Sequence, residues 1–151
     1  MRRKEKEITD INEIESIICR SQVCRLALVD EGLPYIVPLC FGYKDKILYF
    51  HSAKEGQKLE ILRRNHQVCF EFDIDARVLP GKAACNWTVA YKSVIGFGTA
   101  SILEDSEEKK KALDIIMHQY SEDDFKYADK TLAKMLVIKV DISRMTGKKS
   151  D

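Results

Sequence analysis

The segment from Tyr49 to Lys58 carries the residues best suited to chemistry in this sequence. It predicts a strand that ends at His51 and Ser52 and turns directly into a helix bearing Lys58. The first N–H groups of a helix lack partners within it, and the helix dipole adds partial positive charge there. A phosphate group is a natural occupant of such a place. The Ser52 hydroxyl, the close approach that Gly56 allows and the Lys58 charge would strengthen the attraction.

The same segment also has an ordinary structural interpretation, because many strand–helix junctions carry serine and lysine without binding an anion. The His51 side chain could donate a hydrogen bond to a phosphate, or it could give a proton to a molecule that is being reduced at the site, since histidine exchanges protons near neutral pH. It could equally end the strand and hydrogen-bond the backbone, and both interpretations stay open. His66 is expected at a helix end and His118 on a solvated helix face.

The elements that position this segment follow from the periodicity of apolar residues. Tight turns between most of the strands favour antiparallel pairing, and strands of this number usually close into a small barrel. Side chains fill such a barrel, so a large cofactor would bind outside it, in a cleft between two copies of the chain. Helices are predicted over 10–20, 55–65 and 105–120, strands over 23–29, 35–43, 47–51, 67–73, 89–103 and 136–142, and a loop over 76–87.

Three residues interrupt the predicted strands. Pro38 has no N–H for a ladder, so it indicates either an edge strand or a bulge that faces a ligand. Gly96 and Gly98 lie two apart on the longest strand and therefore share one face. That face is predicted to admit a ligand or another backbone at close range.

Length and charge set the broad class. A chain of 151 residues predicts a single domain, 1–151, in which the charged segment 1–8 is a loose arm. The net charge of +1 argues against nucleic acid or an anionic membrane as partner. No apolar segment is long enough to span a bilayer, and the N-terminus lacks a signal-like apolar segment, so a cytoplasmic location is expected.

The five cysteines are odd in number and irregularly spaced, without a CxxC pair. Reduced, structural thiols are therefore expected, and no metal site is predicted. Cys24, Cys40 and Cys69 lie in apolar runs and are predicted to be buried. Cys85 lies in a polar loop and is the one thiol to test for reactivity.

The order of these motifs resembles the pyridoxamine 5′-phosphate oxidase-like, FMN-binding split-barrel superfamily, and within it the nitroimidazole-resistance branch. The resemblance spans nearly the entire chain. Each motif is weak alone, but their order and spacing together are specific. They are the opening 1–4, then 23–27, 34–35 with 37–38, 41–43, 50–53 with Gly56 and Lys58, 91–98 and 145–148.

The resemblance implies a mostly β fold with inserted helices, an antiparallel split β-barrel that forms a homodimer with one FMN in each of two clefts at the interface. It also implies the cofactor contacts by position. These are Val37, Pro38 and Leu39 along the flavin ring, Ser52 and Lys58 at the phosphate with His51 beside them, Tyr91, Lys92 and Ser93 near the ribityl phosphate, and Arg25 and Trp87 as further cleft contacts.

Two departures from the family pattern bear on function. True pyridoxamine phosphate oxidases carry an arginine where this strand begins at Tyr35, and a C-terminal Arg- and His-rich segment that this chain lacks. Gln57 also stands where the family places an arginine beside the phosphate lysine. The resemblance therefore implies a flavin-dependent oxidoreductase that reduces a small, electron-poor acceptor, such as a nitroimidazole, to an amine. The alternatives are a non-catalytic FMN- or haem-binding carrier, or a split barrel that has lost its ligand.

Overall fold

The computed structural model describes residues 3–150, which form one antiparallel sheet with helices packed on it. The helices are η1 (Lys4–Lys6), α1 (Ile11–Arg20), α2 (Gln57–Arg64), η2 (Ala84–Asn86), α3 (Ser106–His118) and α4 (Asp129–Leu132). The strands are β1 (Glu7–Ile8), β2 (Cys24–Asp30), β3 (Leu33–Leu39), β4 (Gly42–Lys44), β5 (Ile47–Ala53), β6 (Gln67–Leu79), β7 (Thr88–Leu103) and β8 (Met135–Ser150).

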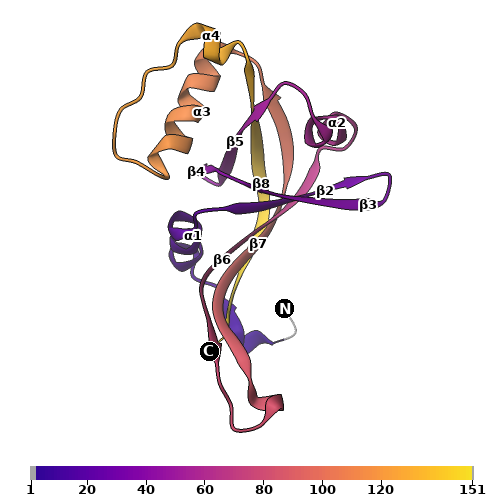
Figure 1. The fold of residues 1–151 in the computed structure, drawn as a ribbon, viewed down its shortest axis with the longest axis vertical. Helices are drawn as coiled ribbons and strands as arrows, with labels where there is room; N and C mark the ends of the chain where they lie inside the picture. The colour runs from indigo at the N-terminus through magenta and orange to yellow at the C-terminus, as the bar shows by residue number, and fades with distance from the viewer. Residues whose placement is uncertain (1–2, 151) are drawn as a thin grey trace.

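The sheet has a wide body and a narrow stem (Figure 1). Its strand order is β3-β2-β6-β7-β8-β5-β4, with β1 added to β8. Figure 1 shows β6, β7 and β8 running from the body into the stem, with α1 at the junction and both termini beside the stem. The helices α3 and α4 lie on one side of the body and α2 on the other. This arrangement confirms the predicted mostly β, antiparallel split-barrel fold.

Side-chain caps explain where the two longest helices begin. Asp10 accepts a hydrogen bond from a backbone N–H in the first turn of α1, and Asp105 does the same for α3. Each cap satisfies donors that the helix leaves unpaired. Glu108 is in the position predicted for a capping box, but at α1 the matching residue, Glu13, instead pairs with Lys92 on β7.

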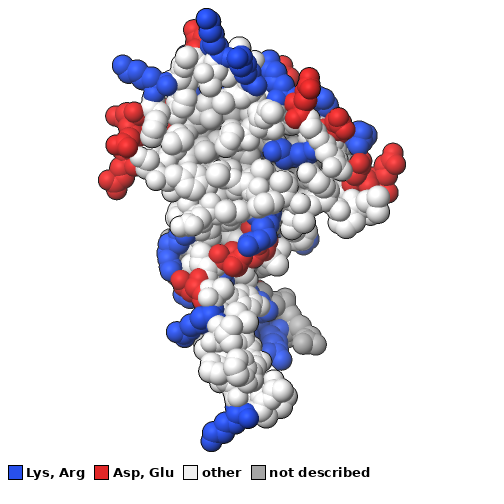
Figure 2. All heavy atoms as spheres, in the orientation of Figure 1, with Lys and Arg blue, Asp and Glu red and all other residues white. Residues whose placement is uncertain are grey.

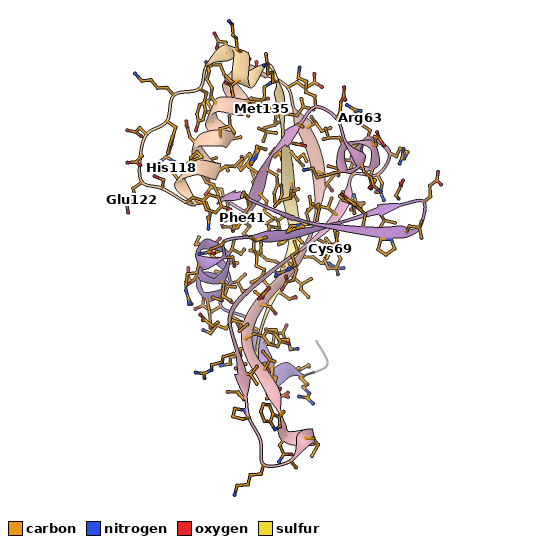
Figure 3. All side chains as sticks on the ribbon, in the orientation of Figure 1. Phe41, Arg63, Cys69, His118, Glu122 and Met135 are labelled. Atoms are coloured by element: carbon orange, nitrogen blue, oxygen red, sulfur yellow. The ribbon has the colours of Figure 1, made fainter. Side chains whose placement is uncertain are left out.

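The main core fills the body between the sheet, α1 and α2. Four phenylalanines are its largest fully buried side chains, and Figure 3 shows Phe41 in the interior of the body. A second, smaller cluster joins α3 and α4 to β8. The four phenylalanines of the main core are Phe41, Phe50, Phe70 and Phe72.

The protein itself occupies the space beside the two strand glycines. A Cβ added to Gly96 would collide with the ring of Phe70. A Cβ added to Gly98 would lie 2.5 Å from the carbonyl oxygen of Asp141. The predicted close approach is therefore made by a side chain at one glycine and by the neighbouring backbone at the other.

The position of Pro38 confirms an edge strand. The turn 31–32 has positive φ at both residues and is closed by the pair Asp30–Leu33. The closing pair of such a turn is hydrogen-bonded, and hydrogen-bonded pairs then alternate along the ladder. Pro34 and Pro38 consequently stand where an N–H would point to the free edge. The two prolines therefore remove no hydrogen bond between β2 and β3. They also deprive the free edge of two N–H donors, which hinders pairing with another strand.

Several predicted boundaries were wrong because strand pairing overrides local composition. The segment 35–43 is two strands, β3 and β4. Residues 76–79 of the predicted loop continue β6, whereas residues 80–87 form the connection to β7 and contain η2. The last strand runs on to Ser150, because β7 offers it a partner along that whole length. Residues 4–8 of the predicted loose arm form η1 and β1, and β1 pairs with β8, whereas residues 1–2 lie outside the described residues.

The five cysteines are free thiols in the structure. Cys24 is buried and Cys69 partly buried, as expected from their apolar surroundings. Cys40 is exposed, which contradicts the predicted burial, because β3 ends at Leu39 and the chain leaves the sheet there. No helix within residues 3–150 combines the length and apolar character needed to cross a membrane. The same residues contain no cluster of three or more His, Cys, Asp or Glu placed to hold a metal ion.

Candidate functional site

A hollow of about 370 Å³, here called the cradle hollow, lies between β3, the end of β5 and the start of α2. One wall is largely apolar and is formed by alternate residues of β3, since alternate residues share one face of a strand. The other wall is the segment 51–59. The β3 residues are Tyr35, Val37 and Leu39, and the predicted cofactor residues that line the hollow are Val37, Leu39, His51, Ser52 and Lys58.

Lys58 is the one cation among the residues that line the cradle hollow. Its side chain is half-buried and makes no ion pair or hydrogen bond with another residue of the described chain. Burial lowers the pKa of Lys58, because desolvation disfavours the charged ammonium group. An anion held in the hollow would restore a counter-charge to this group.

The start of α2 adds backbone donors. Gly56 is the N-cap residue, and its carbonyl accepts from Leu59 and Glu60. The N–H groups of Gln57 and Lys58 are left without helical partners, as at any helix start. Gly56 has φ of +127°, and a Cβ there would meet nothing within 4 Å. The positive φ, rather than a lack of space for a side chain, therefore explains why position 56 is a glycine.

The junction is less direct than predicted, since β5 continues to Ala53 and three residues separate it from α2. Strand alternation also separates the two polar residues at its end. Ser52 shares the buried face of β5 with Phe50, whereas His51 leaves on the opposite, exposed face. Ser52 is only 7% exposed and is the better placed anion donor.

Arg25 does not reach the cradle hollow. It lies on the outer face of the sheet, where its guanidinium donates to Glu71 at 3.0 Å and also to Asp73. Burial and the nearby Asp73 raise the pKa of Glu71, and Arg25 opposes this rise. A charge shared between two carboxylates is poorly available to a phosphate. Pro38, on the edge strand β3, is paired with Arg25 of β2 and is not among the residues that line the hollow.

The remaining predicted contacts lie on the stem. Tyr91 accepts a hydrogen bond from Lys148 at 2.6 Å, Lys92 pairs with Glu13 at 2.8 Å, and Ser93 is buried. Within one chain these residues are remote from the cradle hollow. Ser52 pairs with one end of β8 and Tyr91 with the other. Trp87 is 57% exposed near the tip of the stem.

Tyr35 and Glu55 are polar residues that line the cradle hollow and that sequence reasoning missed. Tyr35 lies two residues before Val37 on the same strand face, so alternation could have identified it. Glu55 precedes the glycine that begins α2, and no local signal distinguishes it from a solvated residue of an ordinary helix start. Gln57, which the family resemblance had placed beside Lys58, also lines the hollow. His118, on α3, contacts its own helix, with Nδ1 2.7 Å from the carbonyl oxygen of Asp114.

The coiled antiparallel sheet, with a hollow between its edge strand and a short helix, defines a split-barrel protein. The sequence model of the pyridoxamine 5′-phosphate oxidase family matches residues 10–149, so the chain belongs to that family. The predicted resemblance is thereby confirmed. Among curated proteins, no sequence matches significantly.

Solved structures agree with this assignment. A provisionally assigned 5-nitroimidazole antibiotic resistance protein from Bacteroides thetaiotaomicron shares 40% identity over 95% of this chain and 86% of its own, with a TM-score of 0.86. The flavocytochrome Anf3 from Azotobacter vinelandii has 17% identity and a TM-score of 0.87, covering 100% of this chain and 72% of its own. An FAD- and haem-binding protein from Mycobacterium smegmatis has 20% identity and a TM-score of 0.88, covering 97% and 74%. The last two show the fold alone.

Proposed function

We propose that this chain is an FMN-binding flavoprotein that reduces small, flat, electron-poor acceptors such as nitroimidazoles, converting the nitro group to an amine. The observation that carries the proposal is the half-buried, unpaired Lys58 in the cradle hollow, opposite an apolar strand face. The 40% identity to the Bacteroides protein supports the choice of acceptor.

The residues present fit the phosphate of FMN. Lys58 offers a charge that burial has already stripped of part of its water, and Ser52 offers a hydroxyl. The first N–H groups of α2 add donors that favour an anion. Hydrogen bonds to charged groups are among the stronger ones in proteins, so this set suits a phosphate better than a neutral ligand.

The apolar wall suits a flat ring system. Tyr35, Val37 and Leu39 exclude water from one side, and the free edge of β3 offers backbone groups along it. When bound, FMN supplies the electron-transfer chemistry, and the chain supplies binding, orientation and electrostatics.

The proposal includes a homodimer. The cradle hollow of about 370 Å³ is at the lower end of the size range of ligand pockets, so a second chain would be needed to complete the cofactor site. The outer face of the sheet exposes Ile36, Ile95 and Phe97, and the guanidinium of Arg144 lies 4.4 Å from the centre of the Phe97 ring. A second copy covering this face would bury those side chains. It would also bring stem residues such as Trp87 and Tyr91 toward a neighbouring cradle hollow.

Titration tests the cofactor. We expect FMN fluorescence to be quenched by one equivalent of chain, FAD and riboflavin to bind more weakly, and sedimentation to show a dimer. Phe97→Glu should dissociate the dimer by burying a charge at its interface. Unquenched FMN, or a stable monomer with a tightly held flavin, would contradict the proposal.

Anaerobic mixing tests the reaction. Conversion of a nitro group to an amine takes six electrons and releases two water molecules, and each reduced FMN supplies two electrons, so three reduced flavins are consumed per nitro group. The reduced protein should be reoxidised by a nitroimidazole faster than free reduced FMN, and the amine should be found by mass spectrometry when an external electron donor keeps the flavin reduced. Tight FMN binding without acceptor-dependent reoxidation would instead indicate a carrier. A Soret band in the purified protein would indicate a haem-binding role.

A further inference from the structure

A second hollow, here called the stem hollow, lies beneath α1 where the stem leaves the body. Its volume is about 690 Å³, larger than that of the cradle hollow, and the two share no lining residue. Four elements contribute to it: α1, β6, β7 and β8. The residues that bear on its chemistry are Glu13, Asp75, Arg77, Lys92 and Lys149.

Strand register brings three cations onto the face of the stem that meets α1. Lys92 of β7 lies directly opposite Lys149 of β8. Like charges that face each other across two strands destabilise a sheet. Arg77 of β6 lies opposite Ala90, two residues along β7, and therefore shares this face. Stability of the sheet gives no reason to gather these charges, so a ligand is the better explanation.

A bulge in β6 is what places Arg77 there. The register shifts between Ile74 and Arg77, so that two residues of β6 stand opposite one of β7. Asp75, the first of the two, has a positive φ of 58°. An uninterrupted strand would turn Arg77 to the opposite face, because side chains alternate. Bulges of this kind often re-aim a side chain next to a functional site.

Among the described residues, the nearby acids leave two of the three cations, Arg77 and Lys149, without a counter-charge. Glu13 is engaged with Lys92 at 2.8 Å, and Asp75 is engaged with Arg20 at 2.7 Å. Arg77 and Lys149 make no ion pair or hydrogen bond within residues 3–150, and both are exposed. In Figure 2, basic side chains predominate on the visible face of the stem below α1.

We propose that the stem hollow binds a small molecule bearing a diphosphate group. Adjacent strands lie about 4.8 Å apart, so cations on three strands span about 10 Å. That spread matches two linked phosphates better than one. The hollow also has room for a group of nucleoside size beyond the diphosphate. Tyr91 and Lys92, which the family resemblance places near FMN, also line the stem hollow, so the proposal requires that the stem hollow stay separate from the cofactor cleft.

The experiment uses the full chain and inorganic pyrophosphate as the probe, titrated calorimetrically at low ionic strength. We expect saturable binding of one pyrophosphate per chain. Arg77→Ala/Lys149→Ala should weaken it at least tenfold, since these exposed side chains are the uncommitted cations. The matched control, Lys111→Ala/Lys126→Ala, removes the same charge from exposed lysines outside the stem hollow and should bind like the wild type. Circular dichroism verifies that each variant is folded.

Three further readouts decide the proposal. FMN affinity should be unchanged in Arg77→Ala/Lys149→Ala, and excess FMN should not displace pyrophosphate. ADP should bind at least as tightly as pyrophosphate. The proposal is wrong if pyrophosphate does not saturate, if the control variant loses as much affinity, or if ADP is excluded. Competition by FMN would also overturn it, because the stem hollow would then belong to the cofactor cleft.

Discussion

The cradle hollow and the stem hollow attract anions by opposite means. The cradle hollow has one cation, Lys58, half-buried beside an apolar wall and a helix start. The stem hollow gathers Arg77, Lys92 and Lys149 on a strand face that is open to water. The first concentrates its attraction at one desolvated contact, and the second spreads it over several hydrated charges.

This difference has consequences for specificity. The interaction between two charges strengthens as the effective dielectric constant around them falls, so a partly buried ammonium can fix one phosphate in place. Exposed charges act mainly through a long-range electrostatic field. Such a field attracts a polyanion but depends little on the shape of that polyanion. The cradle hollow is therefore suited to a resident cofactor, and the stem hollow to a ligand that exchanges.

The largest expected effect is the loss of FMN affinity in Lys58→Ala. Removing a charge-assisted contact should cost about 1.5–3 kcal/mol, roughly a 10- to 150-fold rise in Kd. Fluorescence quenching measures it. Riboflavin affinity should not change, because riboflavin has no phosphate. Lys54→Ala is the matched control, since Lys54 is exposed in the same segment. An equal loss in both variants would show that Lys58 acts only through net charge.

Salt should separate the two hollows. Screening lengths fall from about 30 Å at 0.01 M to about 8 Å at 0.15 M ionic strength. Pyrophosphate binding in the stem hollow should weaken by about tenfold over that interval, because its cations are exposed. FMN binding should weaken by only about twofold, because Lys58 is partly shielded from ions. Parallel titrations at the two salt concentrations measure both changes. Equal salt dependence would remove the distinction drawn between the hollows.

The pH dependence of FMN binding should be smaller, amounting to severalfold. A bound phosphate favours protonated Lys58, so affinity is full below the Lys58 pKa and falls as pH rises through it. Burial lowers that pKa from the ordinary lysine value of 10.5, so the fall begins at lower pH than an exposed lysine would give. Titrations from about pH 7.5 to about pH 10 measure it. Lys58→Arg stays protonated and should bind FMN evenly across this range.

The residues of the cradle hollow could be predicted because most of them are neighbours in the sequence. His51, Ser52 and Lys58 lie within one strand–turn–helix segment, whose composition and spacing signal its chemistry. The family resemblance, rather than a local pattern, added Val37 and Leu39. The same local signals identified α1 and α3 from their caps and apolar spacing. Local sequence did not reveal that β5 continues past Ser52 or that Gly56 needs a positive φ.

The stem hollow as a group of residues could not be predicted from the sequence, although the family resemblance had singled out Tyr91 and Lys92 as cofactor contacts. Glu13, Arg77 and Lys149 are far apart along the chain, and each resembles an ordinary solvated charge. They meet only through the register of three long strands and a bulge that shifts one of them by a residue. The stem itself was missed for the same reason. Its polar residues read as a loop, whereas long-range pairing extends β6 and β8 through them.

The smallest expected effect concerns Glu13, the acid that competes with a ligand for Lys92 in the stem hollow. Glu13→Gln removes a partly exposed ion pair, which should change the free energy of unfolding by at most about 1 kcal/mol. It also releases Lys92 to the ligand. Pyrophosphate affinity should therefore rise by about two- to fivefold, corresponding to one additional charge contact in water.

Calorimetric titration of Glu13→Gln measures this rise, with Glu122→Gln, an exposed acid distant from the stem, as the charge-matched control. FMN affinity should be the same in both variants, because neither residue lines the cradle hollow. A fall in pyrophosphate affinity would mean that Glu13 holds Lys92 in the orientation that binds. The ion pair would then be part of the stem hollow's binding apparatus, and its three cations would not act as an additive field.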